Sequence, residues 1–559
     1  YNYIELRKEL IKQGHLFRTK TDTEVIIHLY EQYGDECISK LRGMFSFAIW
    51  DEKKQKLLIV RDRVGIKPLY YYINNDFLVF SSEVKSLLAD PAIICEIEND
   101  AIFQFFAFNY LPGDMTLFKN IKKLLPGHFI TVTAGKINFQ QYWDLVFHEK
   151  AHKLNFKDTT EQLIELLAKT VSEHMISDVP VGFLLSGGID STAMMSYAVE
   201  NTDKKISSFT IGFEGRHFAD ERPYAKIAAE RFGSTHYDIT MTADDFLDFL
   251  PGYVWHMEEP VVEPPAIALY YVSKLASEHV KVLISGEGGD EAFAGYQNYR
   301  SLVWLERLKR KCGPFNSMIG NIFSTFGPIP VLEKLVKYAG AMKTPLSQYY
   351  YSRTSTPFTF FNSQFCNFYS EDMQHKYHQE LVLKSFNDLF EKVAGKDDLT
   401  KMLYVDSKTW LPNDLLIKAD KITMANSVEL RVPLLDHKIL EFAAQLPSEY
   451  KLRRFNTKFS IKQAMGKRVP IEIIKRKKTG FPVPFESWLQ HELNEVIKNL
   501  SLDSRTLNRG YFKKESLEKL INENKNNGTY SREIFSLIVF ELWNRTFLDK
   551  ENVESMPLN

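Results

Sequence analysis

The chain has 559 residues, which is too long for one compact hydrophobic core, so we expect at least two domains. Its 70 lysine and arginine residues nearly balance its 71 aspartate and glutamate residues, and this balance argues against nucleic acid or an anionic membrane surface as a dominant partner. No apolar run approaches the roughly 20 residues that span a bilayer, so we expect no membrane insertion.

The cysteines point to a reducing compartment. They are too few for a disulfide scaffold and none has metal-ligand or redox spacing; the four are Cys37, Cys95, Cys312 and Cys366. Because no signal peptide stands at the start, this pattern predicts a cytoplasmic protein. The first residue is Tyr1 rather than methionine, so we expect the native start to lie upstream.

Strand patterns dominate the first 145 residues or so. Residues 24–33 have the apolar spacing of a helix, whereas 57–60 form a short apolar strand run. Residues 70–73 and 77–80, joined by three turn-forming residues, are typical of a β-hairpin. A turn at 126–128 leads into another alternating segment. We therefore predict a first domain that is rich in strands and contains some helix.

Helix and strand patterns alternate beyond a polar linker predicted at residues 148–160. Buried-strand runs lie at 181–185, 206–213, 236–239 and 280–284, with helical patterns at 191–200 and 224–232 between them. This alternation indicates a parallel sheet covered by helices on both faces. Residues past 300 are mainly helical in pattern, and 530–547 form an amphipathic helix. The basic run at 475–478 lacks interleaved aromatic residues, so we interpret it as a solvated loop.

A glycine-rich loop follows the first of these strands and opens a helix. It consists of Ser186, Gly187, Gly188, Ile189, Asp190 and Ser191. Glycines let the backbone approach a ligand, and N–H groups of the loop and of the helix N-terminus can converge on an anion. The serine hydroxyls add donors, and Asp190 can hold Mg²⁺ against phosphate oxygens. This order favours a phosphate cradle over a plain turn, although the Gly-Lys-Ser/Thr ending of a Walker loop is absent.

A second loop follows the strand at 280–284. It consists of Ser285, Gly286, Glu287, Gly288, Gly289, Asp290 and Glu291. Parallel sheets bind ligands at the carboxyl ends of their strands, so both loops should face one crevice. Acidic groups beside a phosphate cradle require a cation, so we interpret Asp190 and Asp290 as a pair of magnesium ligands. Glu287 remains available for proton transfer. The alternative is a surface turn rich in acidic residues.

Both loops resemble known signatures. S-G-G-I-D-S is similar to the pyrophosphate loop of the ATP-pyrophosphatase superfamily, and S-G-E-G-G-D-E to the second signature of the asparagine synthetase B family. The likeness continues through residues 418–421 and 424–433. Residues 20–24 and 61–70 resemble the glutaminase domain of that family. The resemblance covers nearly the whole chain, and the paired loops at their spacing are its most specific part.

The resemblance implies an α/β plus α+β fold. Residues 1–147 would form a glutamine amidotransferase domain of the N-terminal-nucleophile type, with layered antiparallel sheets and helices. Residues 160–559 would form an ATP-pyrophosphatase domain with a parallel sheet and a helical carboxyl-terminal part. The implied activity is that of an ATP-dependent carbon–nitrogen ligase, which adenylates a carboxylate and transfers ammonia from glutamine to it.

Matching positions imply roles for individual residues. Those for ATP binding are Ser186, Gly187, Gly188, Asp190, Ser191, Ile211, Ser285 and Gly286, with the backbone of Ile211 meeting adenine. Glu287 matches the catalytic glutamate, and Lys458 matches a lysine that steadies charge on the leaving pyrophosphate. Asp290 matches a contact to pyrophosphate and magnesium. Asp22 matches an aspartate that holds the α-ammonium group of glutamine.

The chain departs from the family at its start. The family's glutaminase works through an amino-terminal cysteine, and Tyr1-Asn2 resembles the end of the family's N-G-E-I-Y-N segment. None of the four cysteines is terminal or beside an obvious base, so the chain as given should not hydrolyse glutamine. The intact motif around Asp22 favours truncation over natural loss.

A second departure lies at residues 258–268. Bacterial synthetases that use free aspartate carry threonines and an arginine there, whereas this chain has no arginine or lysine until Lys274. Two acceptors therefore stay open. The first is aspartate, which gives asparagine; the second is a cell-wall or surface-polysaccharide carboxylate, such as diaminopimelate or a uronic acid.

Two further readings are disfavoured. The intact Asp22 motif speaks against an enzyme that closes a β-lactam ring, and the retained acidic residues of both loops speak against a non-catalytic protein. The expected partners are small molecules, namely glutamine or ammonia, ATP with Mg²⁺, and the acceptor. A homodimer remains open.

Overall fold

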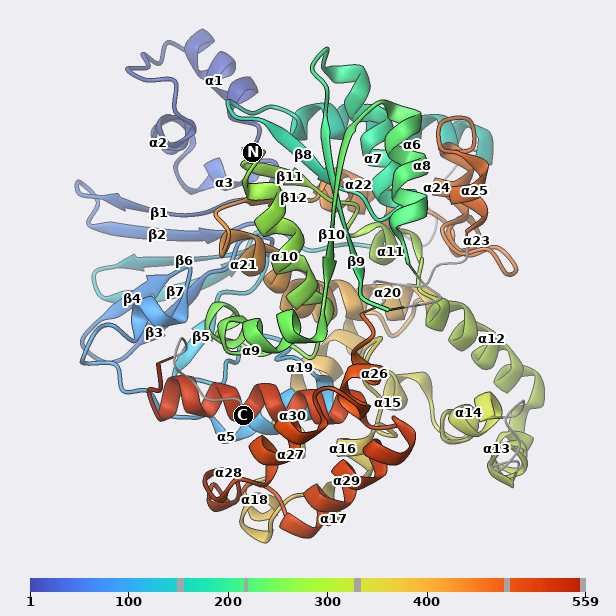
Figure 1. Ribbon diagram of the computed structural model, residues 1–559. Coiled ribbons are helices and arrows are strands. Elements are labelled where there is room, and N and C mark those ends of the chain that lie inside the picture. The colour runs from blue at the N-terminus through green and yellow to red at the C-terminus, as the bar shows by residue number, and fades with distance from the viewer. Residues whose placement is uncertain (148–154, 216–219, 326–332, 477–482, 553–559) are drawn as a thin grey trace.

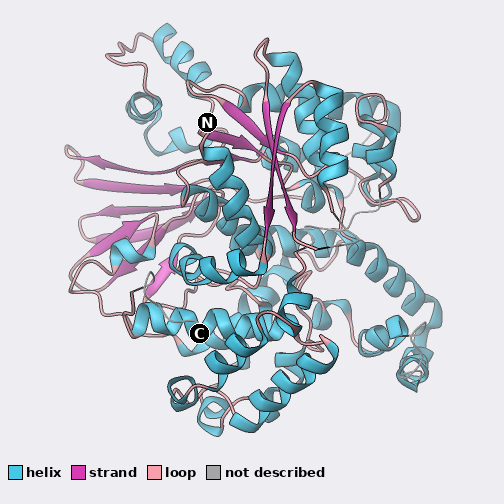
Figure 2. Cartoon of the chain, viewed as in Figure 1, coloured by secondary structure: helices cyan, strands magenta, loops and turns pink. Residues whose placement is uncertain are grey.

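The computed structural model describes residues 1–147, 155–215, 220–325, 333–476 and 483–552. Antiparallel strands of the amino-terminal part lie to one side of a parallel sheet, and helices make up most of the rest (Figure 1). Figure 2 shows the two groups of strands in magenta among the helices. The predicted combination of an α+β part and an α/β part is confirmed. None of the described helices is both long enough and apolar enough to cross a membrane.

Two small antiparallel sheets form the amino-terminal part. The strand orders are β1-β2-β6-β7 and β4-β3-β5. The bounds are β1 (Ser46–Asp51), β2 (Lys56–Arg61), β3 (Tyr70–Ile73), β4 (Leu78–Ser81), β5 (Ile121–Lys123), β6 (His128–Thr133) and β7 (Lys136–Gln141). Ile59 and Ile130 of the first sheet share a buried cluster with Tyr71 of the second, which joins the two sheets. The predicted hairpin is confirmed as β3 and β4.

Two helices cover the first sheet. They are α1 (Tyr3–Lys12) and α2 (Asp22–Tyr33). Leu10 of α1 and Leu29 of α2 share a buried cluster with Leu58 of β2. The helix predicted at residues 24–33 is therefore confirmed as α2, which begins two residues earlier than the apolar spacing indicated.

The third sheet is parallel, with the strand order β10-β9-β8-β11-β12. Its strands are β8 (Val181–Leu184), β9 (Ser207–Phe213), β10 (Thr235–Met241), β11 (Val282–Ile284) and β12 (Glu429–Arg431). Helices α7 (Ile189–Ala198) and α8 (Arg222–Phe232) lie on one side and α10 (Pro265–Ser277) on the other (Figure 1). The direction of winding reverses at β8, so the carboxyl ends of β8, β9 and β11 are where a ligand crevice is expected.

The predicted linker is wrong in its second half. Residues 148–154 lie outside the described residues, but α6 (Phe156–His174) already begins at Phe156. The side chain of Asn155 accepts the backbone N–H of Asp158 at 3.0 Å and caps this helix. An asparagine cap supplies an acceptor for an otherwise unpaired N–H group, so polar residues here start a helix rather than a loop.

Helices make up most of the chain beyond residue 285. The longer ones are α12 (Gln297–Cys312), α13 (Asn316–Thr325), α14 (Glu333–Lys343), α19 (Gln379–Lys392), α20 (Asp398–Lys408), α21 (Leu416–Met424), α22 (His437–Gln445), α27 (Asn494–Leu502), α29 (Lys514–Asn527) and α30 (Ser531–Trp543). The helix predicted at 530–547 is confirmed as α30 and the turn that follows it. Its aromatic face packs on α5 (Asn99–Phe108), where the rings of Phe106 and Phe540 lie 5.2 Å apart.

Buried charges join the amino-terminal sheets to the rest of the chain. The carboxylate of Glu258, which is 0% exposed, accepts the backbone N–H groups of Val84 and Lys85 at 2.9 and 2.7 Å and pairs with Lys421. Lys123 of β5 pairs with Glu259 at 3.0 Å. Removing one partner of such a buried pair leaves an uncompensated charge, so these contacts fix how the two parts meet.

Asp62 organises the turn after β2. Its fully buried carboxylate accepts four backbone N–H groups at 2.7–3.1 Å, those of Val64, Gly65, Ile66 and Lys67. The neighbouring guanidinium of Arg61 donates to the carbonyl oxygens of Gly65, Lys67 and Leu124. The segment at 61–70 therefore owes its shape to hydrogen bonds that two buried charged side chains make to its backbone.

We expect Asp62→Ala to destabilise the protein strongly. Each buried N–H group left without an acceptor costs about 1–3 kcal/mol, and those of Val64, Ile66 and Lys67 lose theirs at once. The N–H group of Gly65 keeps the backbone carbonyl oxygen of Asp62 at 3.3 Å. The measurement is the first unfolding transition in calorimetry or urea. Asp76→Ala, at an exposed position of the β3–β4 turn, is the control and should leave that transition in place. Equal stability of the two variants would contradict the assigned role.

Candidate active site

A cavity of about 520 Å³ opens at the carboxyl ends of β8, β9 and β11. Ten of the predicted site residues line it, namely Ser186, Gly188, Asp190, Ser191, Ile211, Ser285, Gly286, Glu287, Asp290 and Lys458. Gly187 forms the turn of the first loop without lining the cavity, and Asp22 lies elsewhere, at the start of α2. The structure thus brings both glycine loops to one crevice.

The first loop turns tightly into α7. Gly187 has a φ of +61°, and a Cβ there would lie 2.4 Å from Cβ of Tyr224. Gly188 is the N-cap of α7, and its N–H group donates to Oγ of Ser186 at 3.3 Å. The hydroxyls of Ser186 and Ser191 lie 3.2 Å apart at the N-terminus of α7. Donors gathered at a helix N-terminus are suited to a phosphate group.

The second loop lies directly against the first. A Cβ on Gly286 would come within 2.5 Å of the backbone nitrogen of Ser191 and 2.8 Å of Cβ of Asp190. Real Cβ atoms do not approach other atoms so closely, so only glycine lets the loops touch. This contact places the acidic residues of the second loop beside the phosphate cradle.

Lys458 bridges the two loops. Its ammonium pairs with the carboxylate of Asp190 and lies 2.7 Å from Oδ1 of Asp290. Lys458 is 3% exposed and precedes α24 (Phe459–Ala464) with a φ of +53°. Oδ1 of Asp190 is buried and has no hydrogen-bond partner among the described residues. The two carboxylates already pair with one cation, the Lys458 ammonium, and the unpartnered oxygen of Asp190 could also coordinate a Mg²⁺ ion.

Glu287 lines the same cavity. Burial raises the pKa of its carboxyl to about 7; Lys418 opposes that rise and Glu291 adds to it. Oε2 of Glu287 is buried without a hydrogen-bond partner among the described residues. A carboxyl group whose pKa lies near neutrality can take up a proton during a reaction and release it afterwards.

Three charged residues that the sequence did not single out line this end of the cavity. Glu263, from the divergent segment 258–268, accepts a hydrogen bond from Nζ of Lys418 at 3.0 Å. The guanidinium of Arg353 lies over the rings of Tyr296 and Trp410, 3.8 and 4.4 Å from their centroids. Basic side chains therefore reach the cavity from α21 and from the loop after α15 (Leu346–Tyr349), although segment 258–268 has none.

The solvated-loop interpretation of residues 475–478 is wrong for Arg476. Its guanidinium donates to the carbonyl oxygen of Ser186 at 3.0 Å and pairs with Glu221 at 2.9 Å. Both Lys475 and Arg476 line the cavity, whereas residues 477 and 478 lie outside the described residues. Lys475 and Arg476 contribute positive charge to the phosphate cradle. The lack of aromatic residues in this basic run did not indicate such a role.

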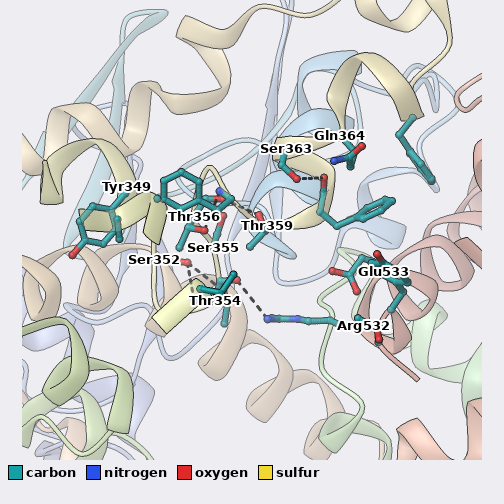
Figure 3. A pocket seen from close by; sticks show the side chains of 18 of the residues that line it. Tyr349, Ser352, Thr354, Ser355, Thr356, Thr359, Ser363, Gln364, Arg532 and Glu533 are labelled. Atoms are coloured by element: carbon teal, nitrogen blue, oxygen red, sulfur yellow. Dashed lines mark hydrogen bonds between the residues drawn. The ribbon is translucent and has the colours of Figure 1, made fainter. Parts of the chain in front are cut away.

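A second, larger cavity of about 1070 Å³ lies beside the first and shares Arg353 with it. Hydroxyl side chains of residues 352–363 line one wall, and α30 supplies Arg532 and Glu533 (Figure 3). A guanidinium nitrogen of Arg532 lies 3.5 Å from the carbonyl oxygen of Thr354. Nε of Arg353 is buried without a hydrogen-bond partner among the described residues.

Two of the cysteines have a raised pKa, which makes them unsuited to act as nucleophiles at neutral pH. Burial raises the pKa of Cys37 to about 12 and that of Cys95 to about 11. A thiol with such a pKa stays protonated, and the thiolate is the reactive form.

Two glycine loops with acidic residues meet at the strand ends of a parallel sheet, an arrangement suited to binding ATP. Family comparison agrees: the asparagine synthase model matches residues 162–545, and the glutamine amidotransferase domain model matches residues 1–143. The chain therefore belongs to the asparagine synthase family.

Individual relatives share most of their length with this chain. It is 36% identical over 552 residues to glutamine-hydrolyzing asparagine synthetase 1 of Bacillus subtilis, which covers 98% of this chain and 85% of that protein. It is 27% identical over 536 residues to asparagine synthetase 3 of the same organism, covering 93% and 80%. Amidase chry2 of Gibberella zeae is 26% identical over 590 residues, covering 98% and 85%.

We expect Gly286→Ala to weaken ATP binding by about tenfold or more. The added Cβ collides with the backbone of Ser191, so the loops must separate and the cradle loses its shape. Calorimetric titration with ATP measures the affinity. Gly395→Ala, where a Cβ meets nothing within 4 Å, is the matched control. An unchanged affinity in Gly286→Ala would show that the loop contact is not needed for binding.

Proposed function

We propose that this chain is a glutamine-dependent asparagine synthetase. In the proposed reaction the side-chain carboxylate of aspartate attacks the α-phosphorus of ATP, and ammonia then displaces AMP to give asparagine. The observation that carries this proposal is the buried carboxyl of Glu287, with a pKa of about 7, in the same cavity as the phosphate cradle. The printed names of the relatives in Bacillus subtilis support the choice of product.

The cradle would hold the departing pyrophosphate. Ser186, Ser191 and the N-terminus of α7 offer donors, and Arg476 and Lys458 supply positive charge. Asp190 and Asp290 would hold Mg²⁺, which neutralises phosphate charge when bound. As pyrophosphate leaves, its new negative charge lies next to Lys458, and a fixed cation in a dry site stabilises such charge strongly.

Glu287 would complete the second step. Ammonia forms a bond to the acyl carbon, the bond from that carbon to AMP breaks, and one proton must leave the nitrogen. The carboxylate of Glu287 can accept this proton because its pKa lies close to neutrality. Burial of the site keeps water away from the acyl-adenylate, which it would otherwise hydrolyse.

The amino-terminal part would supply the ammonia. We assign the glutaminase domain to residues 1–147 and the synthetase domain to residues 160–559. Asp22, at the start of α2, would hold the α-ammonium group of glutamine. Its backbone carbonyl oxygen accepts the hydroxyl of Tyr1 at 2.5 Å, so the first residue of the chain lies at this position.

A second candidate is a ligase of the same chemistry that acts on a larger carboxylate, such as diaminopimelate or a uronic acid. The observation in its favour is the cavity of about 1070 Å³ beside the active site, whose hydroxyl-rich wall suits a polar molecule (Figure 3). Arg353 stands between the two cavities with a donor to spare and could bind a carboxylate of the acceptor.

We expect Glu287→Gln to lower ammonia-dependent amide formation by about 100-fold or more while ATP affinity stays within a few-fold. The wild-type rate, corrected for free ammonia, should rise about tenfold per pH unit below 7 and level off above it, because only the ionised carboxyl accepts a proton. The exposed Glu52→Gln is the control. A variant that keeps both the rate and the pH profile would exclude Glu287 as the base.

The acceptor is identified by supplying the chain with ATP, Mg²⁺ and ammonium together with one acceptor at a time. Mass spectrometry then follows AMP, pyrophosphate and the amide. We expect the three products in equal amounts with aspartate. The same products only with diaminopimelate or a uronic acid would establish the second candidate, and no AMP with any acceptor in a chain that binds ATP would contradict both.

A further inference from the structure

Three metal-ligating side chains converge between α1 and α2, away from the cavity described above. Nδ1 of His15 lies 3.2 Å from Nδ1 of His28, and the latter lies 2.7 Å from Oε2 of Glu31. Nδ1 of His15 and Oε2 of Glu31 are 3.7 Å apart. The two histidine side chains are largely buried, at 14% and 16% exposed, whereas Glu31 reaches solvent.

Protons alone satisfy this arrangement poorly. A neutral imidazole carries one proton, and Nδ1 of His28 faces two groups at once. If that nitrogen is protonated, its single proton is shared between His15 and Glu31. If it is not, its lone pair faces the carboxylate of Glu31. Either way, one proton cannot satisfy both contacts, whereas the lone pairs of all three converging atoms could coordinate one cation.

The three separations match the spacing of ligands around a tetrahedral metal ion. Zinc binds histidine nitrogen and carboxylate oxygen at about 2.0–2.2 Å, so ligand atoms of a tetrahedral site lie about 3.3–3.5 Å apart. The observed 2.7, 3.2 and 3.7 Å lie on both sides of that spacing. Two histidines and one glutamate also form a known three-ligand set for zinc, which leaves the fourth position open.

The far nitrogen of one ring has an oxygen partner, as it does in metal sites. Nε2 of His15 lies 3.0 Å from Oε1 of Gln32, whereas Nε2 of His28 lies 3.7 Å from Oε1 of Glu24, which is beyond hydrogen-bond reach. An oxygen acceptor behind a ligating histidine holds the proton on the far nitrogen and leaves the near nitrogen free for metal. Phe17 packs edge-on against His28, with ring centroids 4.5 Å apart, and fixes the orientation of that ring.

We propose that His15, His28 and Glu31 form a binding site for a divalent transition-metal ion of the zinc type, with solvent as the fourth ligand. The ion would tie the segment after α1 to α2. That segment, residues 13–21, leads directly to Asp22 at the start of α2, so the ion would stiffen the stretch that presents Asp22.

Zinc binding to the full chain tests this site. The protein is dialysed against a chelator and titrated with Zn²⁺ without nucleotide, and Co²⁺ is used as the absorbing probe. We expect His15→Ala to bind one Zn²⁺ fewer than the wild type and to lose the visible bands of tetrahedral Co²⁺. Gln32→Ala, which removes only the acceptor behind His15, should bind about 10- to 100-fold more weakly. His378→Ala, at an exposed histidine, is the control and should bind as the wild type does.

A local readout separates this site from adventitious binding. Arg18 and Lys20 are exposed trypsin sites within the segment that the ion would hold. We expect Zn²⁺ to slow cleavage at these two residues several-fold in the wild type and His378→Ala, but not in His15→Ala. Equal Zn²⁺ stoichiometry in the wild type and His15→Ala, or cleavage that ignores Zn²⁺, would overturn the proposal.

Discussion

The contact of two glycine loops around one buried lysine is the constraint on which the active site depends. Asp190 and Asp290 belong to different loops, and their carboxylates approach each other only because the Lys458 ammonium lies between them. Two unpaired carboxylates this deeply placed would repel each other and pay a large desolvation cost. The lysine removes that repulsion, and the absence of a side chain at Gly286 removes the steric obstacle. Charge and shape therefore bring together segments that are about a hundred and about 170 residues apart in the chain.

The same cavity separates two kinds of charged group by environment. Near the phosphate cradle, Lys458 pairs with the carboxylate of Asp290, and Arg476 donates to the carbonyl oxygen of Ser186. This region is therefore suited to phosphate and its metal ion. In the same cavity, burial shifts the pKa of Glu287 towards neutrality, and Lys418 only partly opposes that shift. The carboxylates of Asp190 and Asp290 instead pair with Lys458. This contrast is what the proposed reaction needs, because its first step transfers a phosphorus group and its second transfers a proton.

Strand-end geometry predicted both glycine loops of the site, and the family resemblance added the distant Lys458. Asp190 and Glu287 follow strands directly, so strand-end geometry was enough to bring their loops together. Arg353 approaches from a loop whose relation to the sheet depends on tertiary packing, and nothing in its local pattern marks it. Lys418 lies in the segment 418–421 that resembles the family, but its place in the cavity also depends on tertiary packing. Arg476 was misinterpreted because a short basic run looks the same whether it faces water or a carbonyl oxygen. Roles carried by the family resemblance still await the experiments given above.

The divergent segment 258–268 shows why substrate choice is hard to infer from composition. Its lack of basic residues suggested a changed acceptor pocket, yet two of its three glutamates serve the contact with the amino-terminal part: Glu258 binds backbone N–H groups and Lys421, and Glu259 pairs with Lys123. Only Glu263 faces the cavity, where Lys418 balances it. A single segment therefore touches both the amino-terminal sheets and the active site.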